Sequence, residues 1–185
     1  AYHVRDFYAS QVLSMILVGG MASRLFQEVR EKRGLCYSVY AFHWGFSDTG
    51  IFGVHAATGQ DDLEKLVPLI LSELRRVSED LTEAEVDRVR AQYRASLLMS
   101  AESASSRSGQ IARQMILFGR TVTTDELMDR LSKITVERLK DLARRLFIDT
   151  VPTVAAIGPV SKLMSYEDIC AALSENVPLP HKIAV

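Results

Sequence analysis

Cysteine and net charge are both scarce in this sequence, and each shortage excludes a class of protein. The 185 residues include two cysteines, Cys36 and Cys170, which have neither metal-knuckle spacing nor the number that a disulfide framework needs. A reducing compartment is therefore expected. The formal net charge of −1 gives no electrostatic reason to expect nucleic acid or an anionic membrane as a partner.

Long apolar runs are also missing. The most apolar stretch, residues 12–18, is interrupted by Ser14 and stops at a glycine, so we expect no membrane span. The first residues show neither a basic region nor a small-residue cleavage site, and no secretory signal is expected. The remaining composition, 48% hydrophobic and 24% charged, is that of a globular protein with room for one core.

The histidines are isolated from one another along the chain. None of the four, His3, His43, His55 and His181, has another within five residues. A zinc motif with two histidines on one helix face is therefore absent, and we expect this chain alone neither to bind catalytic zinc nor to cleave peptides. If the turn between two predicted strands centres near Asp48, His43 and His55 lie nearly opposite each other. Without a third ligand at suitable spacing, packing is favoured over a metal site.

The sequence is organised around residues 19–37, which read GGMASRLFQEVREKRGLCY. The glycine pair invites a phosphate-loop interpretation, but neither Gly-Lys-Ser/Thr nor a third glycine in register follows. A tight turn between two helices is favoured instead. Leu25, Phe26 and Val29 then have the spacing of a buried helical stripe.

A helix-to-strand junction is predicted at Gly34. Glycine at this position suits a helix that ends in the left-handed conformation, and an aromatic-rich strand follows. This geometry brings Arg30, near the helix end, close to Tyr37, at the start of the strand. A cation and a phenol on one side of such a junction can contact an extended peptide or its reacting carbonyl.

Hydrophobic periodicity predicts the other elements. Helices are expected at about 5–17, 61–77, 83–97, 111–118, 124–131, 136–148 and 166–173, and strands at 35–44, 50–58 and 151–158. The first helix is apolar over so wide a surface that it should lie between two layers. Thr82 and Thr123 begin capping boxes, the serine-rich stretch 100–108 should connect two helices, and Gly119 should end a helix.

These elements predict an α+β fold with a mainly antiparallel sheet covered on one face by helices. We expect a domain at residues 1–160. Residues 161–185 should form a C-terminal tail that packs elsewhere, because three of the five prolines lie at 159–185.

The run GGMASRLFQEVREKRGLCYSVY, followed by DTGIFG at 48–53, closely resembles the carboxy-terminal, zinc-free domain of the pitrilysin/insulinase peptidases, which include the mitochondrial processing peptidases. The resemblance covers about residues 4–160 and implies the same α+β fold. Family members place a strand before the first helix, so the first strand is expected to be truncated here. An exposed sheet edge would then favour domain swapping or a homodimer.

In that family an arginine and a tyrosine seven positions later complete an active site on a different domain, and they match Arg30 and Tyr37. The resemblance implies a zinc metalloendopeptidase in which this chain supplies two substrate-binding residues, Arg30 and Tyr37. Tyr37 would also be catalytic, donating a hydrogen bond to the scissile carbonyl. Zinc would be bound by an N-terminal domain or partner subunit that carries H-x-x-E-H, and a peptide would be the substrate.

The implied compartment is the bacterial cytoplasm, or the mitochondrial matrix in a eukaryote. The alternative is a non-catalytic structural or partner subunit of the same fold, as in the core proteins of respiratory complexes. Arg30 and Tyr37 would then be ordinary surface residues. Three strand aromatics, Tyr40, Phe42 and Trp44, could contact apolar substrate groups or pack in a core, and a structural role is favoured for Cys36.

Overall fold

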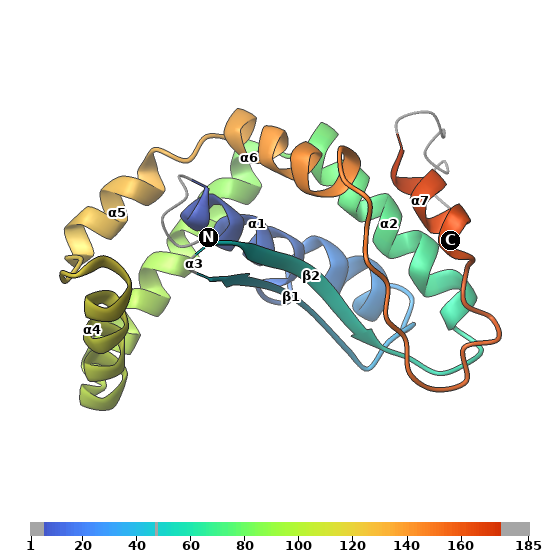
Figure 1. Cartoon of the computed structure of the whole chain (residues 1–185), viewed down its shortest axis with the longest axis horizontal. Helices are drawn as coiled ribbons and strands as arrows, with labels where there is room; N and C mark the ends of the chain where they lie inside the picture. The colour runs from blue at the N-terminus through green and yellow to red at the C-terminus, as the bar shows by residue number, and fades with distance from the viewer. Residues whose placement is uncertain (1–5, 47, 175–185) are drawn as a thin grey trace.

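The computed structural model describes residues 6–46 and 48–174, and it confirms the α+β class (Figure 1). In chain order the elements are α1 (Phe7–Val18), the π-helical turn η1 (Phe26–Glu31), β1 (Ser38–Gly45), β2 (Gly50–Ala57), α2 (Leu63–Glu79), α3 (Glu83–Glu102), α4 (Ala104–Phe118), α5 (Thr124–Ser132), α6 (Val136–Ala143), the π-helical turn η2 (Arg144–Ile148) and α7 (Tyr166–Leu173). Helices therefore dominate, and the two strands form one antiparallel hairpin.

The centre of the core is α1. It packs against β1 on one side and against α2, α3 and α6 on the other, as Figure 1 shows. Five of its residues have no exposed surface: Ala9, Val12, Leu13, Ile16 and Leu17. The predicted position of this helix between two layers is therefore confirmed.

The β1–β2 hairpin presents one face to α1 and the other outward. Register pairs Gly45 with Gly50, so the turn is centred earlier than the sequence suggested. As a result His43 lies opposite Phe52, and His55 lies opposite Tyr40. Because neighbouring positions alternate between faces, the two histidines point to opposite sides of the sheet. The expectation that they face each other was wrong.

Helix boundaries follow the local signals in the sequence. Thr82 begins α3 with a reciprocal capping box, in which its hydroxyl accepts from the Glu85 N–H and the Glu85 carboxylate accepts from the Thr82 N–H. Ser103 separates α3 from α4 and caps the second of these helices. Gly119 ends α4 in the left-handed conformation, with φ of 68°. The boundaries at Thr82 and Gly119 confirm the predictions, whereas the predicted connection at 100–108 is shorter than expected, because every residue of that stretch except Ser103 is helical.

The predicted strand at 151–158 was wrong. Those residues have no regular secondary structure, and Val151 and Ile157 are largely exposed. A strand requires a neighbour for its N–H and C=O groups, and within the described residues only β1 and β2 pair with each other. Apolar composition alone therefore does not produce a strand at this position.

The last helix, α7, is packed rather than detached. It lies against α2 and contributes Ile169 and Leu173 to the core. The expectation that the C-terminal region packs elsewhere does not hold for this helix, while the rest of the predicted tail, 175–185, lies outside the described residues. A domain boundary near residue 160 stays a prediction. Among the described helices, none has the length and apolar character that crossing a membrane requires.

Candidate substrate-binding site at Arg30 and Tyr37

A glycine-closed turn connects η1 to β1. The Gly34 N–H donates to the Arg30 carbonyl at 3.0 Å, and the Leu35 N–H donates to the Val29 carbonyl at 2.8 Å. Gly34 has φ of 60°, the left-handed conformation that the sequence predicted for the end of this helix. The helix itself is wider than expected, because residues 26–31 form a π-helical turn, a rare form that is frequent at functional sites.

Tyr37 is placed by the backbone at the entrance to β1. Its N–H donates to the Ala57 carbonyl at 3.1 Å, and the Thr58 hydroxyl donates to the Leu35 carbonyl two residues earlier at 2.5 Å. The backbone is therefore held at Tyr37 and just before it, while the side chain is 87% exposed. A shallow depression beside it is lined by Gly34, Leu35, Cys36, Tyr37, Ala57, Thr58, Gly59 and Asp62.

Arg30 is exposed near the end of η1 and lies over an aromatic ring. Its guanidinium carbon is 4.8 Å from the centroid of the Phe26 ring, within the range of a cation–π contact. Gly34 bonds to the Arg30 carbonyl and leads directly into the strand that carries Tyr37. The structure thus places both predicted site residues at the surface of one helix-to-strand junction.

Cys36, between these residues, is buried and free. Burial raises the pKa of its thiol, and the positive charge of Arg30 only partly opposes this rise. A structural role is consistent with such a protonated thiol, since no set of a histidine and a carboxylate is evident in the sequence to activate it.

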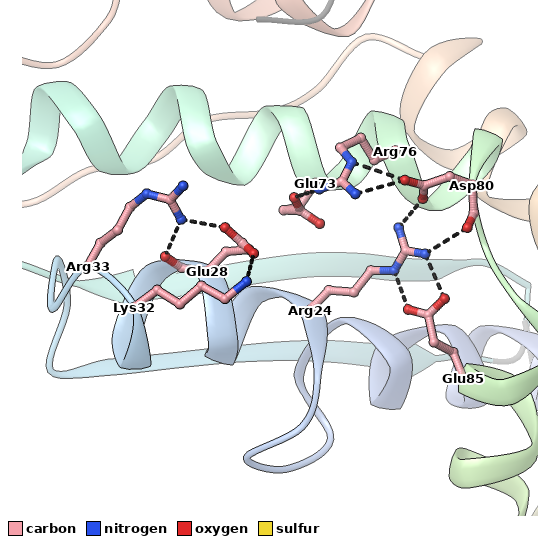
Figure 2. Close-up of polar contacts among 8 residues, drawn as sticks. All are labelled: Arg24, Glu28, Lys32, Arg33, Glu73, Arg76, Asp80 and Glu85. Atoms are coloured by element: carbon pink, nitrogen blue, oxygen red, sulfur yellow. Dashed lines mark hydrogen bonds and ion pairs between the residues drawn. The ribbon is translucent and has the colours of Figure 1, made fainter. Parts of the chain in front are cut away.

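The start of the same segment is anchored by a cluster of charges that Figure 2 shows. Arg24 donates from Nε to Glu85 Oε1 at 2.6 Å and from Nη2 to Glu85 Oε2 at 2.8 Å. It also donates from Nη1 to the Asp80 carboxylate at 2.5 Å and from Nη2 to the Asp80 carbonyl at 3.2 Å. One nearly buried arginine therefore ties the chain before η1 to the connection between α2 and α3.

Burial raises the pKa of Glu85, but the hydrogen bonds from Arg24 and Thr82 outweigh it and bring the pKa down to about 2. Its neighbour Glu73 behaves oppositely. That carboxylate is 3% exposed, and burial raises its pKa despite the hydrogen bond that Arg76 donates at 2.5 Å. Arg76 also donates to Asp80, so the five side chains form one network (Figure 2).

A second acidic group, Glu28, lies on η1 between two cations. Its carboxylate accepts from Lys32 at 2.5 Å and from Arg33, which also donates to the Glu28 carbonyl at 3.0 Å (Figure 2). Burial alone would raise the pKa of Glu28, but these two hydrogen bonds hold it below its ordinary value. Glu28 and Lys32 are four residues apart, the spacing at which oppositely charged side chains meet on a helix.

In the part of the chain that the structure describes, the donor side chains do not fit a catalytic zinc ion. Within residues 6–46 and 48–174, no three His, Cys, Asp or Glu side chains gather closely enough to hold a metal. His43 packs edge-on against Phe7, and His55 stacks on Tyr40 at 4.6 Å between ring centroids. Both histidines therefore have packing partners, as the sequence favoured.

Three strand aromatics share the outward face of the hairpin. The ring centroids of Phe42 and Trp44 are 4.6 Å apart, and those of Tyr40 and Phe42 are 6.2 Å apart. Tyr40 and Trp44 remain about half exposed, so they do not belong to the core. Of the two roles left open by the sequence, core packing is thus wrong for this pair.

Sequence reasoning missed the Arg24 network and the contact of Arg30 with Phe26. The Arg24 partners lie 56 and 61 residues away, and no local pattern links them. Phe26 had been placed on the buried stripe, and its spacing of four residues from Arg30 was a usable signal.

Comparisons with known proteins show which family the chain is similar to. The family model described as "Peptidase M16 inactive domain" matches residues 1–93. An "Uncharacterized zinc protease" of Rickettsia bellii is 36% identical over 157 residues, which cover 85% of this chain and 38% of that protein. A "Probable mitochondrial-processing peptidase subunit beta" of Arabidopsis thaliana is 33% identical over 129 residues, covering 70% of this chain and 24% of that protein.

A solved structure shares the fold. One chain of complex III from Candida albicans, with Inz-5 bound, superposes with a TM-score of 0.81 at 21% identity over 93% of this chain and 43% of that chain. The present chain thus spans well under half the length of the relatives that it matches.

Proposed function

The chain belongs to the peptidase M16 family, as the inactive C-terminal domain of its zinc proteases, and from this membership we propose that it completes the active site of a zinc metalloendopeptidase. The zinc and the general base would lie on an N-terminal domain or partner subunit, since the described part of this chain has no suitable donor set. The observation that carries the proposal is the presentation of Arg30 and Tyr37 at one closed junction.

In this proposal Tyr37 donates a hydrogen bond from its hydroxyl to the carbonyl oxygen of the scissile peptide. That oxygen gains negative charge as the carbonyl is attacked, so the bond strengthens in the transition state and lowers the barrier. Such a donor must be held in position before the reaction. The hydrogen bond from Tyr37 N–H to Ala57 and the bond from Thr58 to Leu35 support this role by fixing the backbone.

Arg30 binds the substrate in this proposal. A guanidinium carries five donors in a fixed plane and can hold peptide carbonyls or a carboxylate. Its contribution is the same before and during the reaction, so it lowers KM more than it raises kcat.

The test uses the complete enzyme, this chain together with its zinc-bearing part, and a quenched fluorescent peptide library. Tyr37→Phe should lower kcat by about a hundredfold or more, since one oxyanion donor is lost, while zinc content stays constant. Tyr166→Phe is the matched control. Tyr166 lies on α7, donates its hydroxyl to the Pro152 carbonyl and does not line the depression beside Tyr37, so its replacement should leave kcat unchanged. Arg30→Ala should mainly raise KM.

Two results would change the assignment. If kcat and KM are unchanged in both Tyr37→Phe and Arg30→Ala, then Arg30 and Tyr37 are ordinary surface residues. A folded and associated assembly that cleaves no peptide would favour a structural or partner subunit instead. The absence of H-x-x-E-H from the N-terminal domain or partner subunit would favour it too.

A further inference from the structure

The Arg30 guanidinium differs from its neighbours in what it contacts. Arg24 and Arg33, on the same segment, are both paired with carboxylates. Across the described residues, no ion pair or side-chain hydrogen bond involves Arg30, and its guanidinium carbon lies 4.8 Å from the centroid of the Phe26 ring. The nearby Glu28 carboxylate is already taken by Lys32 and Arg33. All five donors of Arg30 are therefore available to a ligand.

Phe26 is suited to hold this cation without using its donors. The ring is half-buried and packs against the core, so the core fixes its position. An aromatic face attracts a guanidinium through its quadrupole, whereas the N–H groups lie in the guanidinium plane and stay free. An exposed arginine otherwise samples many rotamers, and that freedom is lost when a peptide binds.

We infer that Phe26 is a positioning residue that pre-orders Arg30 for binding the peptide backbone or a substrate carboxylate, an inference that rests on the proposed function. Phe26 contacts no reacting atom. It acts by restricting where the Arg30 guanidinium lies, so that less conformational freedom is lost on binding. Replacing Phe26 should therefore change KM, and it should do so only when Arg30 is present.

The experiment compares Phe26→Leu, Phe26→Tyr, Arg30→Ala and the Phe26→Leu/Arg30→Ala double variant in the complete zinc-bearing enzyme. Phe26→Leu keeps an apolar side chain and removes the ring. It should raise KM about two- to fivefold, the range of an exposed cation–π contact, with kcat nearly constant. Phe26→Tyr restores an aromatic face and should return KM to the wild-type value. In the Arg30→Ala background, Phe26→Leu should raise KM no further.

Phe52→Leu is the matched control. Its ring packs edge-on against Phe147 at 5.3 Å in the core, so the change lowers stability without touching Arg30. It should lower the melting temperature and leave KM unchanged. If Phe26→Leu raises KM equally with and without Arg30, or if Phe26→Tyr fails to restore it, the inference is overturned. Unchanged KM and kcat in Arg30→Ala alone would instead overturn the proposed function of this arginine.

Discussion

Replacement of Arg24 by alanine tests whether the charge cluster holds the segment that carries the site. The side chain of Arg24 is 10% exposed, and it donates to both Glu85 and Asp80. Removing the arginine leaves the Glu85 carboxylate, 17% exposed, without its bidentate partner. Breaking a buried pair from one side costs about 3–5 kcal/mol. Because Asp80 is 43% exposed and can be hydrated, we expect about 3 kcal/mol here.

The dependence of stability on acidic pH should report on the same contact between Arg24 and Glu85. The pKa of Glu85 is lowered to about 2 from an ordinary value of 4.5, so its contribution to stability is present above pH 4.5 and is lost as pH falls toward 2. If the whole pKa shift of Glu85 appeared in the free energy of unfolding, it would contribute about 3.4 kcal/mol. Solvent screens this partly exposed group, so we expect about 2 kcal/mol. Without Arg24, the loss of stability between pH 5 and 3 should be smaller.

Urea unfolding at pH 7, and again between pH 5 and 3, measures both effects. Arg120→Ala is the matched control. Arg120 also donates from two nitrogens to one carboxylate, the Glu126 side chain, but its own side chain is 54% exposed. Because this pair is exposed to solvent, its loss should cost clearly less stability than the loss of Arg24. Equal losses in the two variants would refute the reasoning, since burial would then make no difference to the strength of the contact.

Two glycines give further predictions. Gly34→Ala should lower the free energy of unfolding in urea by about 1 kcal/mol, because φ is 60° and the backbone is strained for a residue with a side chain. Gly59→Ala is the control: its new methyl group also meets open space but φ is not positive, so stability should not change. Gly53→Ala would bring a Cβ within 2.4 Å of the Phe42 ring, so the ring must move. Because Phe42 packs against Trp44, the single tryptophan, this movement should change the tryptophan fluorescence. An unchanged emission spectrum would contradict this packing.

Features governed by short-range contacts were predictable from the sequence. The closure at Gly34, the capping box at Thr82 and the end of α4 at Gly119 each depend on a few consecutive residues. The placement of Arg30 and Tyr37 at one junction followed from that closure. Their roles in catalysis stay a prediction.

Features that depend on distant partners were not predictable. Residues 151–158 have strand composition but no strand to pair with in the described structure, and α7 has weak helical character yet joins the core through α2. A turn centred slightly earlier along the chain was enough to move His43 away from His55. The widening of η1 into a π-helical turn had no recognisable signal either.

The burial of α1 between two layers has a consequence for biosynthesis. Its sequence, FYASQVLSMILV, has no charged residue, and one of the elements that cover it, α6, ends 125 residues after α1 does. At about 5–20 residues per second, a ribosome needs on the order of ten seconds to make that interval. Throughout this time the nascent chain lacks α6, so the part of α1 that α6 covers stays exposed. Chaperone binding to α1 during translation is therefore the expected safeguard against aggregation.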